Sequence, residues 1–301
     1  QFVIALLVLV HRFKPDVVHL HSSFAGALGR VALFLARPFH RCLVVYSPHA
    51  FAFTMDIPEW KRKTYSFIER VLLKVTDALI CTSQHELDVA VRFGLNRNKL
   101  HLIHNGVPDP HAERSISDGV DNTVLQLLFV GRFDHQKGFD VLREAMNHLQ
   151  GRSIRLVAIG AAVHGHETPA PHPQIEYVGW VKHSELARYY RASHLLVMPS
   201  RWEGFAMTPL EALSHGLPVL ASSHPSFNEV VIPNVSGDRF PSGDAITLAN
   251  KIRSLRPLDC LAMRESSYQH FLVNFRDTAM TDATFSMYQN IRPVKSVTSK
   301  I

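Results

Sequence analysis

The loop that follows the apolar segment Leu125–Val130 combines glycines with two cations. It reads GRFDHQKG, from Gly131 to Gly138, and a predicted helix follows it. Glycines allow a backbone to approach a ligand closely, and Arg132 and Lys137 supply the positive charge that two phosphate groups need. A surface loop with two solvated cations would have the same composition. The loop is therefore a candidate diphosphate site that needs independent support.

A second loop with charged residues follows the apolar strand that ends at Pro199. Its Glu203 stands beside Gly204, in a position where a carboxylate can accept hydrogen bonds from sugar hydroxyls. Further along, the sequence TPLE from Thr208 to Glu211 matches a capping box with proline at the first helical position. The pattern predicts a helix that begins near Thr208, whose first N–H groups would form a second anion site. Glu211 can equally serve the capping box alone.

Strand-like and helix-like segments alternate along most of the chain, which predicts an α/β fold with parallel sheets covered on both faces. The predicted strands are 16–21, 42–46, 77–82, 100–104, 125–130, 154–159, 175–178, 194–198 and 218–221. The predicted helices are 1–13, 31–36, 59–75, 140–149, 184–192, 208–215, 245–255, 258–271 and 278–289. Asp140 is the expected N-cap of the helix after the glycine loop.

The length of 301 residues suggests two domains. A polar, proline-containing stretch at 108–123 is the predicted linker. We expect a Rossmann-like domain over 1–115, incomplete because it has too few strands, and a complete Rossmann-like domain over 116–275. The segment 276–301 should supply a C-terminal helix that returns to the first domain, followed by a tail. Since open α/β sheets bind ligands at the carboxyl ends of their strands, the chemistry is expected in a cleft between the domains.

Glu203 and Glu211 belong to a longer pattern, SxxEGFxxxxLEAxxxGxPV from Ser200 to Val219. This pattern resembles the signature of the retaining GT-B glycosyltransferases of family 4. The glycine loop, the VGWV run at 178–181, the NGV run at 105–107 and Glu229 are similar to the family pattern in the same order. The resemblance covers nearly the whole chain. It implies a GT-B fold, with two doubly wound Rossmann-like domains facing across a cleft, and a hexosyltransferase type of activity.

The resemblance also implies a nucleoside-diphosphate sugar as donor substrate, held mainly by the second domain, and no other cofactor. Arg132 and Lys137 would bind the diphosphate beside Gly131, and Glu211 would bind the ribose hydroxyls. Glu203 would bind the sugar and the distal phosphate together with the backbone of Gly204 and Phe205. The backbone around Trp180 and Val181 would hold the base.

On the acceptor side, His49 follows the strand 42–46 and resembles the family's cleft histidine, which lies near the transferred sugar. We expect His49 in the catalytic set with Glu203, Lys137 and Arg132, and His21 is a second candidate. The family's first strand and glycine-rich loop have no counterpart here, so the chain is expected to be N-terminally truncated. The run 222–229 also lacks the glycine pair that often precedes the family's glutamate, which bears on the phosphate geometry near Glu229.

The expected function is retaining, metal-independent sugar transfer to a glycan or lipid-linked acceptor, in surface polysaccharide biosynthesis. The chain has no Asp-x-Asp motif, so cations and a helix end would neutralise the phosphates. His164, His166, Glu167 and His172 lack the defined spacing of a metal site. The alternatives are a non-catalytic nucleotide-sugar-binding relic and a GT-B-fold nucleotide-sugar epimerase.

The charge balance, 32 Lys and Arg against 26 Asp and Glu, suggests an anionic partner. Nucleic acid is the weakest candidate, because the chain has no block of like charges and no nucleic-acid-binding motif. The segment from Trp60 to Val75 interleaves apolar and basic residues. It is either a packed helix with a solvated basic face or a peripheral contact with an anionic membrane.

The three cysteines, Cys42, Cys81 and Cys260, lie far apart in the sequence. Their spacing argues against a disulfide framework and a zinc knuckle, which fits a reducing compartment. The apolar opening of about ten residues is too short to span a bilayer. We therefore expect a cytoplasmic protein, which contacts the inner face of the cell membrane only under the second interpretation of the segment from Trp60 to Val75.

Overall fold

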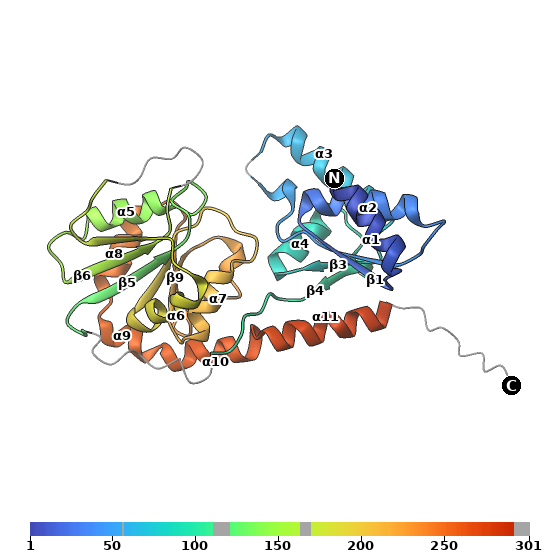
Figure 1. Ribbon diagram of the computed structural model, residues 1–301. Coiled ribbons are helices and arrows are strands. Elements are labelled where there is room, and N and C mark those ends of the chain that lie inside the picture. Colours follow the sequence, from blue (N-terminus) through green and yellow to red (C-terminus); the bar gives the residue numbers. More distant parts are fainter. Residues whose placement is uncertain (56, 111–120, 163–169, 292–301) are drawn as a thin grey trace. The chain divides into compact units, whose positions relative to one another are not determined.

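The computed structural model describes residues 1–55, 57–110, 121–162 and 170–291, and it forms two compact units (Figure 1). The first unit comprises Gln1–His104 and Thr278–Ile301, and the second comprises Asn105–Asp277. The division predicted at 115/116 lies outside the described residues. Each unit is built on a parallel β-sheet, so the α/β class predicted from the sequence is confirmed.

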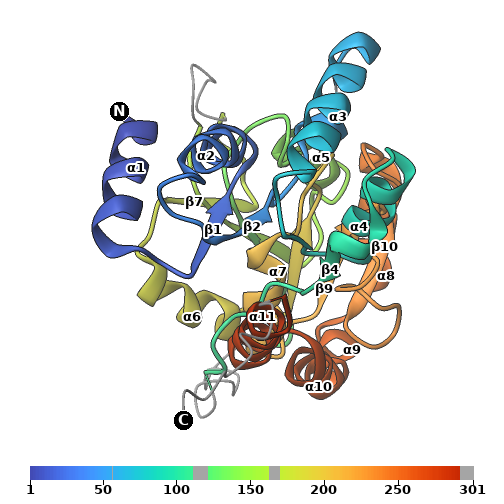
Figure 2. The ribbon, with the colours of Figure 1, turned by 90° about the vertical axis from the view of Figure 1, so that its right-hand side faces the viewer.

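The sheet of the first unit has four parallel strands in the order β1-β2-β3-β4. The strands are β1 (Val17–His21), β2 (Leu43–Ser47), β3 (Ala78–Cys81) and β4 (Leu100–Leu102). α1 (Phe2–Phe13) precedes β1. The helices between the strands are α2 (Ser23–Ala36), α3 (Glu59–Leu73) and α4 (Gln84–Arg92), with short 3-10 turns η1 (Ala52–Thr54) and η2 (Arg97–Lys99). α1 and α2 lie side by side (Figure 2).

The two faces of this sheet are covered by different parts of the chain. Residues of α1–α4 pack with alternate strand residues such as Val44 and Leu79. The other face, which includes Val45 and Ile80, packs against Met287 of α11 (Asp277–Ile291). Successive strand residues point to opposite faces of the sheet, so neighbours such as Val44 and Val45 belong to different cores. The core on the second face is completed by α11, the last described helix of the chain.

The second unit contains a six-stranded parallel sheet in the order β10-β9-β8-β5-β6-β7. The strands are β5 (Leu125–Val130), β6 (Ile154–Ile159), β7 (Ile175–Gly179), β8 (Leu195–Met198), β9 (Val219–Ser222) and β10 (Gly237–Phe240). The helices are α5 (Phe139–Asn147), α6 (His183–Ala192), α7 (Met207–Ser214), α8 (Ala245–Ser254), α9 (Pro257–Ala262) and α10 (Arg264–Asn274), with a 3-10 turn η4 (Pro225–Phe227).

Read from β7 to β10, this is the 3-2-1-4-5-6 order of a Rossmann fold. Leu127 and Phe129 of β5 face a core shared with α5 and α8, while the adjacent Leu128 faces the core that includes α6, α7 and α10. The strand order reverses between β5 and β8, and the helices that follow these two strands, α5 and α7, pack on opposite faces of the sheet. The carboxyl edge at this reversal is where a ligand site is expected in such a sheet.

Some elements differ from those predicted. α4 and β10 were not predicted, and the single helix predicted over 258–271 is divided into α9 and α10. α7 begins at Met207, with Ala206 as N-cap and no side-chain cap. Gly138, and not Asp140, occupies the N-cap position of α5. All three cysteines are free and buried.

Candidate active site

Gly138 joins the two loops at the point where the strand order reverses. Its φ of +66° lies in the left-handed region, and a Cβ added there would approach the carbonyl oxygen of Pro199 to 2.1 Å. Only glycine satisfies both requirements at once. The backbone N–H of Arg201 also donates to the carbonyl of Gln136 at 2.8 Å. The loop after β5 and the loop after β8 are therefore held against each other.

Arg201 connects the same loops through its side chain. Its guanidinium forms a two-bond pair with the carboxylate of Asp140 in α5, at 2.8 and 2.7 Å. It also donates to the carbonyl of His135 at 2.8 Å. Paired guanidinium–carboxylate bonds restrain geometry more than a single contact does. Neither residue was a predicted site residue, and their role is to fix the loops that carry the site.

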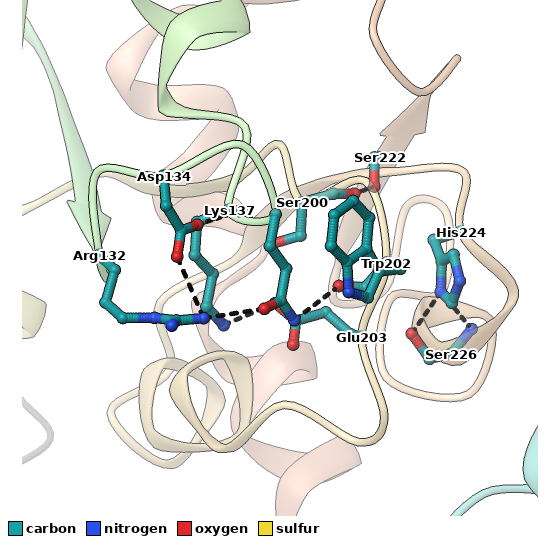
Figure 3. A network of polar contacts seen from close by, with 10 residues as sticks. Arg132, Asp134, Lys137, Ser200, Trp202, Glu203, Ser222, His224 and Ser226 are labelled. Atoms are coloured by element: carbon teal, nitrogen blue, oxygen red, sulfur yellow. Dashed lines mark hydrogen bonds and ion pairs between the residues drawn. The ribbon is translucent and has the colours of Figure 1, made fainter. Parts of the chain in front are cut away.

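Lys137 and Glu203, one from each loop, form an ion pair with Nζ to Oε1 at 2.6 Å (Figure 3). Their side chains are 19% and 7% exposed. The backbone N–H of Lys137 donates to Asp134 Oδ1 at 2.8 Å, which orients the loop around the lysine. The two residues predicted to act on the diphosphate and on the sugar thus lie in direct contact.

Arg132 lies in the same cluster (Figure 3). Its Nη2 is 2.8 Å from Gln136 Oε1 and 3.1 Å from Asp134 Oδ2, and the side chain is 39% exposed. Gln136 in turn donates to the carbonyl of Trp202 at 3.3 Å. Arg132 is therefore held by neighbours while much of its guanidinium stays accessible to an anion. Asp134 and Gln136 were not recognised from the sequence, although both stand within the glycine loop.

The structure contradicts the capping box predicted at Thr208–Glu211. Glu211 is the fifth residue of α7, too far into the helix to reach back to the N-cap. Its Oε2 accepts a hydrogen bond of 2.7 Å from the hydroxyl of Tyr190 in α6, and its Oε1 lies 3.9 Å from His183 Nδ1. Burial, followed by the charge of Glu211, raises the pKa of Tyr190. Tyr190 therefore remains a hydrogen-bond donor, and it orients Glu211.

The other residues that were predicted to bind the donor substrate lie on loops at the carboxyl edge of the sheet. Phe205 is buried in the core beside α7, and its carbonyl accepts from Asn105 Nδ2 at 3.3 Å. The side chain of Phe205 is therefore not accessible to a ligand. Trp180 and Val181 follow β7; the side chain of Trp180 is exposed, whereas Val181 packs against the same core as Phe205.

The carbonyl of Glu229 accepts from His270 at 2.9 Å. His164, His166 and Glu167 lie outside the described residues. Within the described residues no group of three or more metal-ligating side chains is assembled.

His49 belongs to the first unit, where it follows β2. Its φ of 56° is unusual for a residue other than glycine. Its Nε2 lies 2.8 Å from Nδ1 of His21, which ends β1, so the two candidate histidines contact each other. Burial lowers the pKa of His49 first, and the charge of His21 lowers it further.

Several proteins of known structure share this fold. Sucrose-phosphate synthase from Thermosynechococcus elongatus superposes with a TM-score of 0.82 at 23% identity, over 96% of this chain and 77% of the other. Anabaena HepE in complex with UDP and glucose superposes with a TM-score of 0.80 at 18% identity, over 95% and 80%. The fold, as predicted, is that of the GT-B glycosyltransferases.

Family models and sequence relatives give the same assignment. Residues 1–109 match the model "Glycosyltransferase Family 4", and residues 125–256 match "Glycosyl transferases group 1". The chain belongs to this glycosyltransferase family.

A Klebsiella pneumoniae relative, "Uncharacterized 41.2 kDa protein in cps region", is 38% identical over 74% of this chain and 64% of its own length. An Escherichia coli relative, "UDP-Gal:alpha-D-GlcNAc-diphosphoundecaprenol alpha-1,3-galactosyltransferase", is 28% identical over 73% and 61%. The chain thus spans less than two thirds of the length of these relatives.

Proposed function

We propose that this chain transfers a sugar from a nucleoside-diphosphate sugar to a glycan or lipid-linked acceptor during surface polysaccharide biosynthesis. A UDP-sugar is the first donor to test, because the E. coli relative is named for UDP-Gal and a structural neighbour holds UDP and glucose. The cps region of the Klebsiella relative supports a role in polysaccharide assembly. Transfer with retention of anomeric configuration rests on the family resemblance alone.

The contact between Lys137 and Glu203 is the observation that carries this proposal. An ammonium group has three N–H donors, and the bond to Glu203 uses one of them. The others can bind oxygens of the diphosphate as charge builds up on the leaving phosphate, and Arg132 adds a second cation. The carboxylate of Glu203 retains Oε2 as an acceptor for a sugar hydroxyl. The pair is thus suited to the point where a sugar joins its diphosphate.

Two further features suit the remaining parts of a nucleotide sugar. α7 has no side-chain cap, so its first N–H groups and the positive end of its dipole favour a phosphate. Tyr190 occupies Oε2 of Glu211, which leaves Oε1 as the acceptor for a ribose hydroxyl. Both features belong to the carboxyl edge of the same sheet.

The test is product formation from UDP-galactose or UDP-glucose with a diphosphoundecaprenol-linked GlcNAc acceptor. Lys137→Ala should lower turnover by about 100-fold or more, because a cation that stabilises the transition state is lost. Lys251→Ala is the matched control, since Lys251 also pairs with a carboxylate, Asp238, but on α8 and β10. Full activity of Lys137→Ala would overturn the assignment. Nucleotide binding without transfer would instead indicate a binding relic, and an epimerised nucleotide sugar would indicate an epimerase.

Metal-independent transfer is part of the proposal. Arg132, Lys137 and the start of α7 would supply the charge stabilisation that a divalent cation provides elsewhere. Turnover should therefore be the same with EDTA and with added Mn²⁺. Loss of activity on chelation, restored by Mn²⁺, would contradict this part of the proposal.

We also propose that α3 contacts an anionic membrane surface on the cytoplasmic side. None of the helices in the described part of the chain is long and apolar enough to cross a bilayer. α3 buries one side, which includes Leu72 and Leu73, yet Trp60 and Phe67 are 66% and 59% exposed. On a helical projection these exposed residues lie opposite the buried side, and basic residues flank them at positions 61, 63, 70 and 74.

Vesicle sedimentation tests this contact. Binding should require anionic lipid and should weaken in Phe67→Ser, while Ile246→Ser, which changes an exposed residue of α8, should bind normally. Equal binding to neutral and anionic vesicles would contradict the electrostatic part of the proposal.

A further inference from the structure

Three histidines of the first unit lie together at the carboxyl ends of β1 and β2. His19 and His21 alternate along β1, so they share one face of the strand. Their ring centroids are 4.2 Å apart. The rings of His21 and His49 are stacked with centroids 5.1 Å apart, in addition to their hydrogen bond. Each ring therefore has another imidazole as a close neighbour.

His19, the innermost of the three, is anchored on both ring nitrogens. Its Nδ1 lies 2.6 Å from the hydroxyl of Tyr288 in α11, and its Nε2 lies 2.8 Å from Ser47 Oγ at the end of β2. Burial, then the charges of His21 and His49, lowers the pKa of His19 to about 4. His19 is thus a neutral, fixed support for His21 at neutral pH.

The backbone beside His21 and His49 is also held in place by its neighbours. Ser22 and His49, which follow β1 and β2, both have left-handed φ values, 67° and 56°. Ser22 N–H donates to the carbonyl of Ser47, and the Ser23 hydroxyl donates to the carbonyl of Ala50. Strained conformations of this kind persist only where surrounding contacts impose them, and they concentrate at functional sites.

We propose that His21 is the positioning residue of His49, and that the two rings act as one unit that holds at most one positive charge and presents the outer nitrogen of His49, Nδ1, to a sugar hydroxyl. This inference rests on the proposed glycosyl transfer, to which it adds a second histidine.

The tautomers follow from the atoms that meet. One proton lies between His21 Nδ1 and His49 Nε2, and a neutral imidazole carries one proton in all. If His21 donates, its Nε2 is bare and His49 is protonated at Nδ1. If His49 donates, its Nδ1 is bare and His21 is protonated at Nε2. The two neutral rings therefore always have the same tautomer, protonated either both at Nδ1 or both at Nε2. Of the two outer nitrogens, Nε2 of His21 and Nδ1 of His49, one is then a hydrogen-bond donor and the other an acceptor.

A sugar hydroxyl both donates and accepts, so it complements this arrangement in either state. Two imidazolium rings in hydrogen-bonding contact would repel each other, which limits the pair to one charge. Within the described ranges, the other titratable groups in contact with the pair or its support are His19 of β1 and Tyr288 of α11. Tyr288 stays neutral, because burial raises its pKa.

The experiment is nitrogen-detected NMR of the ligand-free protein, with His49→Gln and His21→Asn spectra used to assign the two rings. We expect both neutral rings to show the same tautomer. In His21→Leu the pKa of His49 should rise towards its ordinary value. Opposite tautomers, or an unchanged His49 titration in His21→Leu, would overturn the proposal. Because no substrate is needed, these outcomes are independent of the proposed transfer.

Kinetics supplies the second readout. Asparagine places a polar atom near the position of the histidine Nδ1, so His21→Asn should stay within a few-fold of wild-type kcat/KM. His21→Leu should lose about tenfold or more, since it leaves His49 unpositioned. Equal activity of the asparagine and leucine variants would show that the hydrogen bond is irrelevant to the reaction, and would contradict the positioning role.

Discussion

The hydroxyl of Tyr190 lies 2.7 Å from Oε2 of Glu211, and it joins α6 to α7 beneath the carboxyl edge of the second sheet. Tyr190 is almost completely buried and its ring stacks on His215. The contact places the carboxylate that the family resemblance assigns to ribose. It also explains why Glu211 can stand in mid-helix and still have a fixed orientation.

Removing that hydroxyl should weaken donor binding without unfolding the protein. Tyr190→Phe leaves the ring in place and removes the hydrogen bond, which is worth about 1.5–3 kcal/mol when its acceptor is charged. UDP affinity should fall by about tenfold in a calorimetric titration. Tyr189→Phe is the control on the same helix, since the hydroxyl of Tyr189 accepts a hydrogen bond of 3.0 Å from the exposed Arg188 and does not contact Glu211 in the described part of the chain. Equal affinities for the two variants would argue against an orienting role for Tyr190.

Gly138 and Gly151 form a natural comparison. Both have left-handed φ values, +66° and +76°, but a Cβ at Gly138 would lie 2.1 Å from the carbonyl oxygen of Pro199, whereas a Cβ at Gly151 meets nothing within 4 Å. Gly151→Ala should cost about 1 kcal/mol of unfolding free energy from backbone strain alone. Gly138→Ala should cost about 2 kcal/mol or more beyond that, because the two loops must separate. Denaturant unfolding measures both, and similar losses would show that the loops do not press together.

Acid should destabilise the protein through His19. The pKa of His19 is lowered to about 4 by burial first and then by its two neighbouring histidines, against 6.5 in an unfolded chain. Below pH 6.5 the unfolded state takes up the proton first, so stability is lost as pH falls from 6.5 to about 4. His19→Asn should remove about 1–2 kcal/mol of this pH dependence, allowing for partial solvation.

Exposed His183 supplies the control for that experiment, since its side chain is 80% exposed. His183→Asn should keep the wild-type pH profile. If His19→Asn also kept it, the neutral state of His19 would not contribute to stability in this range.

A buried ion pair holds α2 to α3. Nη1 of Arg30 lies 2.9 Å from Oε2 of Glu69, and its guanidinium lies 3.8 Å from the ring centroid of Tyr46. Arg30→Met alone should cost about 3–5 kcal/mol, because it leaves a buried carboxylate unpaired. Adding Glu69→Leu should recover most of that loss. A double variant as unstable as the single one would show that packing, and not the unpaired charge, is responsible.

β5 and β8 could be predicted because each is a continuous run of mostly apolar residues that is largely buried. α4 was missed although its start carries a signal. Ser83 Oγ accepts from the N–H of Glu86 at 3.0 Å, a capping contact that the spacing of the two residues suggests. β10 could not be found in this way, because the short polar segment Gly237–Phe240 is a strand only through its pairing with β9.

In the candidate site, too, some residues could be predicted from the sequence, whereas the contacts between them could not. Lys137 and Glu203 could be recognised from the residue types at two strand ends, but their contact depends on the strand order, which a pattern of elements does not reveal. The capping box predicted from TPLE was wrong, because the N-cap of α7 is Ala206, two residues before Thr208. The partner of Glu211, Tyr190, lies 21 positions away in the sequence. Only the packing of α6 against α7 reveals it.

The central claim is that Lys137 holds the diphosphate of a nucleotide donor. Calorimetric titration of UDP into wild type, Lys137→Ala and the control Lys251→Ala tests it most directly. The account predicts that wild type and Lys251→Ala bind alike and that Lys137→Ala loses about tenfold or more in affinity, the expected cost of one charge-assisted phosphate contact. Equal binding of UDP by all three proteins would contradict the assignment of this loop as the diphosphate site.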